Sequence, residues 1–294
     1  MDHPRLILVV GLQKSGTTLL ARLLQDAAGL PRLFRAEGDE FWGNVPPFSP
    51  AAYPAGHLYQ RQAGLRGHEL GADEASDDVM ETLRGRLRAL VARPGEVPAV
   101  LNKSPYNSIR LPWVRAIFPD AFIVSLIRAP RPNVFSLLKK YHHNADILGP
   151  RPEAGWWGTK PAGWGDMVRA DKVEQCAYQW CAVNAKLLAD RSYVDLFLSY
   201  AALCADPAAA VRAVTLGAGL PESHLRLDIP GLNCFDQEYE RGSRLRSKNR
   251  YYGELGSVRT PGSEPIEFGP LSPESLRLID GICAPVVSQL AAIS

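Results

Sequence analysis

The sequence has little of what would mark a membrane or secreted protein. It contains no apolar run near the ~18 residues that a membrane-spanning helix needs. The early run at residues 6–10 is short for a secretory leader, and it leads directly into Gly11 and Lys14. We therefore expect no membrane span and a cytoplasmic location.

An excess of one charge and a pattern of paired cysteines are also missing. The chain has 33 Lys and Arg against 31 Asp and Glu, a formal net charge of +2. This balance gives no basis for a nucleic-acid partner, so an anionic ligand would have to be held by local basic groups. The five cysteines are odd in number and form no CxxC pair, which predicts reduced and mostly buried thiols.

Short apolar runs alternate with amphipathic segments along the chain. We expect strands at residues 6–10, 97–101, 121–127 and 193–199. We expect helices at residues 17–28, 77–93, 108–118, 132–141, 173–189, 206–217 and 272–290. Strands that alternate with helices predict an α/β fold with a central parallel sheet flanked by helices. No repeat or linker divides the chain, so residues 1–294 are expected to form a single domain.

Two stretches do not follow this alternation. Residues 144–165 are rich in Gly and Pro and include Trp156, Trp157 and Trp164, and residues 237–265 are polar with little periodicity. Long irregular stretches in a compact domain are often binding loops, so we expect these two to cover substrate and cofactor.

The segment GLQKSGTT at residues 11–18 joins the first predicted strand to the first predicted helix. Backbone N–H groups in such a turn converge at the positive end of the helix dipole, which favours an anion. The candidate anion-binding residues are Gln13, Lys14, Ser15, Gly16, Thr17 and Thr18. The plainer alternative is a capped helix start with no ligand.

This segment differs from the GxxxxGK[ST] loop of nucleotide phosphotransferases. Thr17 and Thr18 follow the second glycine, where that loop has Lys and Ser or Thr. The strand at residues 121–127 runs into Arg128, where a metal-dependent enzyme would need an acidic residue. A basic residue suits a second phosphate. A phosphotransferase with a variant loop and a non-catalytic adenosine-bisphosphate-binding module remain as alternatives.

The loop, with its lysine before Ser-Gly-Thr-Thr, resembles the 5'-phosphosulfate loop of the sulfotransferases that use 3'-phosphoadenosine 5'-phosphosulfate (PAPS). In that family a strand runs into an arginine, a serine follows eight residues later, and the pair holds the 3'-phosphate. Arg128 and Ser136 match this pattern. The resemblance implies a P-loop-like sulfotransferase fold, PAPS as sulfuryl donor, adenosine 3',5'-bisphosphate as product, and no required metal.

Three further segments carry the resemblance. Residues 102–105, Asn-Lys-Ser-Pro, are similar to the Asn-Lys-Asp-Pro segment of tyrosylprotein sulfotransferases. Residues 200–207 resemble the segment near the adenine, which places Tyr200 there. Residues 246–253 resemble the basic loop over the cofactor, which implies cofactor contacts for Lys248, Asn249 and Arg250.

Sulfuryl transfer needs charge stabilisation and a base. Lys14 and Lys103 are the candidates for charge stabilisation, although Lys103 could also be a solvated surface lysine. Cytosolic sulfotransferases use a histidine two residues after this lysine, where this chain has Pro105.

The base must then come from another segment. Residues 37–42, Glu-Gly-Asp-Glu-Phe-Trp, resemble the glutamate-base region of trehalose-type sulfotransferases, which implies Glu40 as base. An alignment to bacterial sulfotransferases with Glu-Gly after the first helix favours Glu37 instead. Phe41 and Trp42 could supply the desolvation that raises a glutamate pKa. The acids could also be a solvated turn, and His142 and His143, more typical of a helix cap, are minor candidates.

The acceptor is expected to be a small molecule with a hydroxyl or an amine, since neither an anchor nor a large basic surface is predicted. Aromatic residues of the Trp-rich segment, residues 144–165, could line one side of the acceptor site. Phe48, Tyr53 and Tyr59 could line the other side. The sequence predicts neither the acceptor nor the oligomeric state.

Overall fold

The structure is a computed structural model. It describes residues 4–30, 41–42, 67–90, 99–143, 155–222, 225–229, 232, 234–244 and 267–292. A four-stranded sheet lies at its centre, formed by β1 (Arg5–Val10), β2 (Ala99–Lys103), β3 (Phe122–Ile127) and β4 (Leu196–Ser199). The spatial order is β2-β1-β3-β4, and all three pairings are parallel. The predicted parallel α/β sheet is therefore confirmed.

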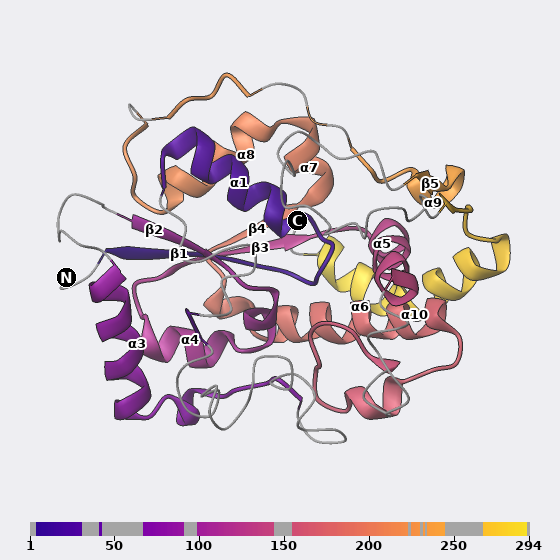
Figure 1. The fold of residues 1–294 in the computed structure, drawn as a ribbon, viewed down its shortest axis with the longest axis horizontal. Coiled ribbons are helices and arrows are strands. Elements are labelled where there is room, and N and C mark those ends of the chain that lie inside the picture. The colour runs from indigo at the N-terminus through magenta and orange to yellow at the C-terminus, as the bar shows by residue number, and fades with distance from the viewer. Residues whose placement is uncertain are drawn as a thin grey trace, which may run out of the picture.

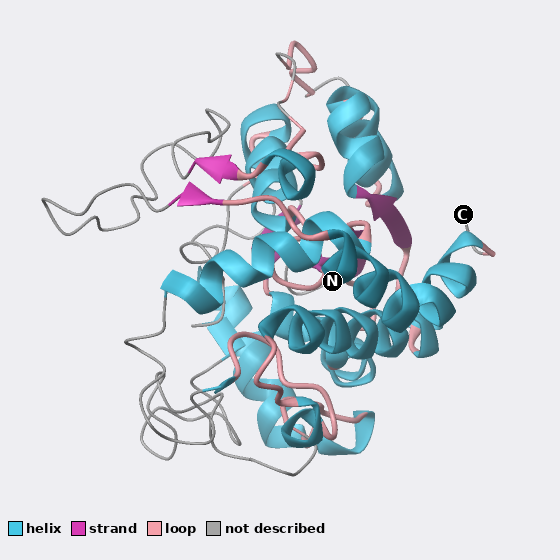
Figure 2. Ribbon diagram, turned by 90° about the vertical axis from the view of Figure 1, so that its right-hand side faces the viewer, coloured by secondary structure: helices cyan, strands magenta, loops and turns pink. Residues whose placement is uncertain are grey.

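Helices cover both faces of this sheet (Figure 1). One face is covered by α1 (Thr17–Ala28), α7 (Tyr200–Ala205) and α8 (Pro207–Gly217). The other face is covered by α3 (Asp77–Leu90), α4 (Leu111–Ile117), α5 (Pro130–His143), α6 (Lys172–Ala189) and α10 (Pro273–Ala291). Figure 2 shows these two helical layers from the side and a separate two-stranded ribbon of β5 (Ser243–Arg244) and β6 (Glu267–Phe268), preceded by the short α9 (Glu238–Arg241).

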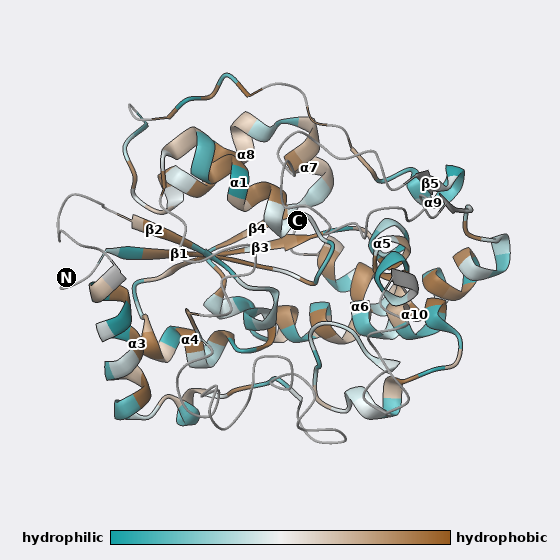
Figure 3. Cartoon of the chain, in the orientation of Figure 1, coloured by the Kyte–Doolittle hydropathy of each residue, from teal (hydrophilic) through white to brown (hydrophobic). Residues whose placement is uncertain are grey.

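The packing of β1 explains why its residues 6–10 are all apolar. Leu6, Leu8 and Val10 pack into the core on the side of α3, α4 and α6. Ile7 and Val9 pack into the core on the side of α1 and α8. Because successive side chains point to opposite faces, a strand covered on both sides favours apolar residues at consecutive positions. Figure 3 shows the same strands as a hydrophobic layer between the helices.

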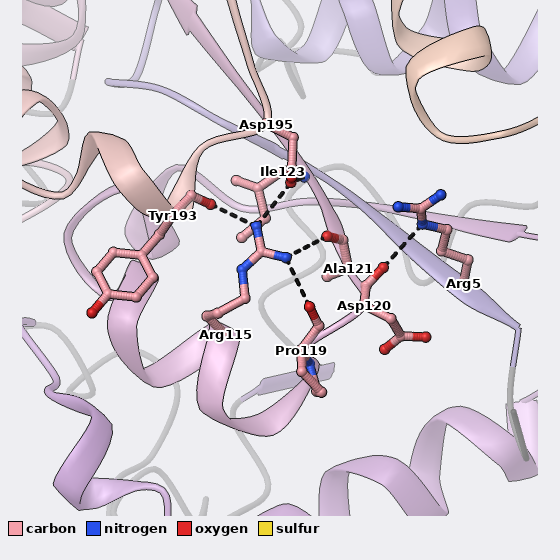
Figure 4. A network of polar contacts seen from close by, with 8 residues as sticks. All are labelled: Arg5, Arg115, Pro119, Asp120, Ala121, Ile123, Tyr193 and Asp195. Atoms are coloured by element: carbon pink, nitrogen blue, oxygen red, sulfur yellow. Dashed lines mark hydrogen bonds and ion pairs between the residues drawn. The ribbon is translucent and has the colours of Figure 1, made fainter.

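A polar network ties the beginning of β3 to the segment before β4 (Figure 4). The guanidinium of Arg115 donates to the backbone oxygens of Ala121 and Tyr193, both at 2.7 Å. It also donates to the Asp195 carboxylate at 2.8 Å, which accepts the backbone N–H of Ile123 at 2.7 Å. These bonds satisfy backbone groups at the amino ends of the strands, opposite the edge where α/β folds bind ligands.

Some expected boundaries were wrong. The helix expected at residues 108–118 is a 3-10 helix, Pro105–Ile109, followed by α4, and the two are separated at Arg110. Arg110 has φ −133°, and its Nε donates to the His68 carbonyl oxygen at 2.7 Å, so the chain leaves the helical path there. The strand expected at residues 193–199 begins at Leu196, because Arg191–Tyr193 forms a 3-10 turn. The ribbon of β5 and β6 was not predicted.

All five cysteines lie in the described part of the chain and are free thiols. Cys176 and Cys283 are buried, while Cys234 is exposed. Burial raises the pKa of the Cys176 thiol, which keeps it protonated. Within the described residues, no helix is both long enough and apolar enough to cross a membrane.

Candidate functional site

The loop between β1 and α1 has an unusual backbone. Gly11 and Gly16 have φ values of +142° and +102°. Lys14, with φ +70°, is the only non-glycine residue with positive φ in the described part of the chain. Such conformations cost free energy and persist where the surroundings require them, often at functional sites. The loop therefore holds its lysine in a fixed, strained turn.

Neighbouring groups leave no room for side chains at the two glycines. A Cβ at Gly11 would lie 2.3 Å from the carbonyl oxygen of Leu126 in β3. A Cβ at Gly16 would lie 2.5 Å from the ring of Tyr200, the first residue of α7. Close packing therefore requires glycine at both positions.

The beginning of α1 lacks the side-chain cap that several longer helices have. Asp171, Asp206 and Ser272 each accept a backbone N–H at the start of α6, α8 and α10. Gly16 supplies no such cap to α1. The nearby Ser15 Oγ is buried and has no hydrogen-bond partner among the described residues. Unpaired donors at a helix N-terminus together with a buried hydroxyl suit an anion.

Distant residues hold the loop in place. Ser108 accepts the Gly11 backbone N–H at 2.8 Å through its hydroxyl oxygen. The side-chain amide of Asn133, in α5, donates to the Gln13 carbonyl oxygen at 3.0 Å. Arg128, at the end of β3, donates from Nη1 to the Lys14 carbonyl oxygen at 3.1 Å. Three elements therefore fix the backbone of one short turn.

Arg128 is itself held on several sides. Its side chain is 5% exposed, and its guanidinium carbon lies 4.5 Å from the centre of the Tyr200 ring. Its Nε donates to the Asp236 carboxylate at 2.7 Å. Its Nη2 is buried and has no hydrogen-bond partner among the described residues. The structure thus brings Arg128 and Tyr200 to the loop at residues 11–16, the predicted phosphate loop, while Ser136 lies half-buried in the second turn of α5.

Lys103 is the last residue of β2 and is 1% exposed. It pairs in register with Val9, two residues before Gly11. The backbone N–H of Ser104 continues this pairing and donates to the Val9 carbonyl oxygen at 3.2 Å. Lys103 is therefore a buried lysine beside the predicted phosphate loop, and the alternative of a solvated surface lysine was wrong.

The two residues after the acidic segment are packed next to β2. Phe41 and Trp42 are 0% and 2% exposed. The indole N–H of Trp42 donates to the Asn102 side-chain oxygen at 3.0 Å, and Asn102 precedes Lys103. Arg86 donates to the Phe41 carbonyl oxygen at 3.0 Å. Residues 41–42 are thus fixed beside the strand that carries Lys103.

Several predicted residues lie outside the described part of the chain. These are Glu37, Glu40, Lys248, Asn249, Arg250, and the aromatic residues Phe48, Tyr53 and Tyr59. The side chains of His142 and His143 are also outside it. Within the described residues, no group of three or more His, Cys, Asp or Glu could hold a metal ion.

Sequence reasoning missed four residues that contact the loop or Arg128. Ser108, Asn133, Thr159 and Asp236 contact Gly11, Gln13 or Arg128 over separations of 97 to 146 residues. No local pattern identifies such contacts. Only Thr159 had an indirect signal, because it lies in the Trp-rich stretch predicted to cover the substrate. Together with the residues above, these contacts build a site with a strained turn, a buried arginine and a buried lysine.

Comparison with known proteins identifies the family. The model of the sulfotransferase family matches residues 4–224. A Caenorhabditis briggsae protein that is named as a protein-tyrosine sulfotransferase is 25% identical over 141 residues, which cover 47% of this chain and 45% of that protein. The chain thus spans less than half the length of this relative. A sulfotransferase crystal structure from Alicyclobacillus acidocaldarius shares the fold, with a TM-score of 0.51 and 16% identity over 99% of this chain and 95% of that one. The chain belongs to the sulfotransferase family.

Proposed function

We propose that this protein transfers the sulfuryl group of PAPS to a hydroxyl or an amine of a small-molecule acceptor. The observation that carries the proposal is the bond from Arg128 to the Lys14 carbonyl oxygen, at 3.1 Å. It joins two basic features, the phosphate loop and the end of β3, into one site. A ligand with two separate phosphate groups, such as PAPS, suits this arrangement better than a single anion.

The 5'-phosphosulfate is assigned to the loop. Gln13, Lys14, Ser15, Gly16, Thr17 and Thr18 surround the uncapped start of α1, and the Ser15 hydroxyl is buried there. Backbone N–H groups at a helix N-terminus bind anions through aligned dipoles, without any need for a metal.

The 3'-phosphate is assigned to Arg128 and Ser136. The Nη2 of Arg128 has no partner among the described residues, so a phosphate oxygen can accept from it. Tyr200 packs on the guanidinium and fixes its plane. Lys248, Asn249 and Arg250 are proposed to contact the cofactor as well, from the family resemblance alone.

Lys14 and Lys103 are proposed to stabilise charge during transfer. The acceptor oxygen or nitrogen attacks sulfur, the bond from sulfur to the bridging oxygen breaks, and that oxygen keeps the electron pair as part of adenosine 3',5'-bisphosphate. Negative charge therefore grows on the bridging side. A buried ammonium such as that of Lys103 interacts with such charge more strongly than a solvated one would.

Glu40 is proposed as the base that takes the acceptor proton, with Glu37 as the alternative. Glu40 is bonded directly to Phe41, and Phe41 and Trp42 are buried beside Asn102 and Lys103. This packing supports a base close to the lysine that stabilises the leaving group. An apolar setting also raises a glutamate pKa toward neutrality, which suits general-base catalysis.

A thermal-shift comparison tests the proposal. Adenosine 3',5'-bisphosphate at about 100 times its Kd should raise the melting temperature by about 5 °C, since a ligand that binds only the folded state stabilises it. ATP with Mg²⁺ should give little shift. The reverse pattern would support a phosphotransferase and overturn the proposal.

A matched pair of arginine variants makes the comparison specific. Arg128→Gln should lose most of the bisphosphate shift. Arg212→Gln should keep it, because Arg212 is an exposed residue of α8 that is paired with Glu222. A non-catalytic binding module would show the same shifts, so PAPS consumption in EDTA with an acceptor library decides between binding and turnover.

A further inference from the structure

Thr159 lies buried at the point where three parts of the site meet. Its side chain is fully buried, and its hydroxyl oxygen accepts from the Gln13 side-chain amide at 2.9 Å. The same hydroxyl donates to the Pro105 carbonyl oxygen at 3.3 Å, two residues after Lys103. The Thr159 backbone N–H donates to the Gln13 side-chain oxygen at 3.2 Å. One threonine thus joins the phosphate loop, the end of β2 and the Trp-rich segment.

The Thr159 backbone oxygen continues this junction into the Trp-rich segment. It accepts the Trp156 indole N–H at 2.9 Å and the Gln179 side-chain amide at 3.4 Å. Gln179 also donates to the Trp157 carbonyl oxygen at 2.8 Å. The Trp156 ring makes an edge contact with Trp164, with centroids 5.9 Å apart. A shift of Thr159 would therefore shift the tryptophans with it.

The side chain of Gln13, in the predicted phosphate loop, has little freedom to move away from Thr159. The Gln13 side chain uses both its oxygen and its nitrogen on Thr159 and is 6% exposed. A Cβ at Gly158, where φ is +88°, would lie 2.9 Å from the Gln13 side chain. Buried amides need their partners, because leaving one unpaired costs more than the bond itself contributes. Gln13 and residues 158–159 therefore form a close-fitting pair.

The neighbouring residue is held by a different partner. The Lys160 backbone N–H donates to His68 Nδ1 at 3.0 Å, and the His68 backbone N–H donates to the Lys160 oxygen at 2.8 Å. Arg110 in turn donates to the His68 oxygen at 2.7 Å. None of these bonds reaches the phosphate loop. Adjacent amides at residues 159 and 160 thus report on two separate anchors.

We propose that Thr159 is a positioning residue that couples occupation of the phosphate loop to the order of the acceptor wall. The inference rests on the proposed function, which assigns the loop to the donor and the Trp-rich segment to the acceptor. When an anion fixes the loop, Gln13 holds Thr159, and Thr159 holds the tryptophans. Binding of the donor thereby orders the surface against which the acceptor binds.

Hydrogen exchange of single backbone amides tests this coupling, with adenosine 3',5'-bisphosphate as the probe. Saturating bisphosphate should slow exchange of the Thr159 amide by about tenfold, and the Lys160 amide much less. Thr159→Val removes the hydroxyl at nearly constant volume but keeps the backbone N–H that donates to Gln13, so it should weaken the slowing at residue 159. Thr159→Ser keeps the hydroxyl and should retain it. Calorimetry should find the bisphosphate Kd within about threefold of the wild-type value in both variants.

A second variant changes Gln13, the bonding partner of Thr159. Gln13→Met removes both bonds to Thr159 with little change of shape, and it should abolish the slowing even if Thr159→Val is poorly folded. Wild-type protein that binds bisphosphate without slowing at Thr159 would overturn the inference and leave the proposed function intact. Undiminished slowing in Gln13→Met that still binds bisphosphate would overturn it as well. Wild-type protein that does not bind bisphosphate would overturn the proposed function, and the inference with it.

Discussion

The carboxylate of Asp236 lies 2.7 Å from the Nε of Arg128 and forms an ion pair with it. Asp236 is 25% exposed, whereas the arginine is 5% exposed. The proposed 3'-phosphate would bind the same guanidinium through Nη2. A fixed negative charge therefore lies next to the place where a second one is expected, and the two repel each other.

Asp236→Asn should tighten the binding of adenosine 3',5'-bisphosphate by about three- to tenfold. The amide oxygen can still accept from Arg128, but the repulsive charge is removed. Titration calorimetry at low and high salt measures the effect, which should shrink as salt screens the charge. Glu240→Gln, an exposed residue of α9, is the matched control and should change little. Weaker binding in Asp236→Asn would mean instead that the carboxylate orients Arg128 for the phosphate.

Glu40→Gln should lower kcat by about 10²- to 10⁴-fold while leaving the bisphosphate Kd nearly unchanged, because the amide cannot take a proton. The measurement is PAPS turnover with an acceptor that the wild-type protein uses. Glu37→Gln is the control, since it removes a similar charge from the same segment. Full activity in Glu40→Gln together with a loss in Glu37→Gln would move the base to Glu37.

Gly16→Ala should lower the free energy of unfolding by about 2–4 kcal/mol, even without ligand. The new methyl would lie 2.5 Å from the Tyr200 ring, at a φ of +102°. Gly29→Ala supplies the comparison, because Gly29 also has positive φ but has no atoms within 4 Å of a Cβ. That variant should lose only about 1 kcal/mol from backbone strain. Equal losses in urea unfolding would show that the contact with Tyr200 is not tight.

Asp280→Asn should reveal a small pH-dependent contribution to stability. A hydrogen bond from Arg131 holds the pKa of Asp280 below its ordinary value of 3.8, so the pair stabilises the fold above that pH. The stabilisation is lost as the pH falls through the lowered pKa. Because both side chains are more than a third exposed, we expect only about 0.5 kcal/mol at pH 7 after solvent screening. Urea unfolding of the wild-type protein and the variant should differ at pH 7 and converge as the pH falls below the lowered pKa of Asp280. A constant difference across that range would contradict the assignment.

The parts of the fold that local sequence signals specify were predicted well. The helix at residues 17–28 was expected with the bounds that α1 has, which begins after Gly16 and ends before Gly29. The strand of residues 121–127 and β3 also agree within one residue. Apolar periodicity and glycine positions act over a few residues, which is the distance over which a sequence can be read directly.

The parts that depend on distant contacts were not predictable in this way. The helical path ends at Arg110, whose guanidinium contacts His68, which lies 42 residues earlier. Thr159 gains its place in the site from Gln13, 146 residues away. Asp236 reaches Arg128 over 108 residues. Nothing in the composition around these positions indicates a partner, since the fold alone brings them together.

Because Lys14 has a positive φ, the stability of the chain and its proposed activity favour different residues at this position. Glycine at this position would relax the backbone by about 1 kcal/mol, yet it would remove the ammonium that the proposed transfer needs. Selection for a more stable scaffold and selection for turnover would therefore choose different residues at the same place. A selection for stability alone should therefore change residue 14 early. The variants selected there should be more stable and should lack transferase activity.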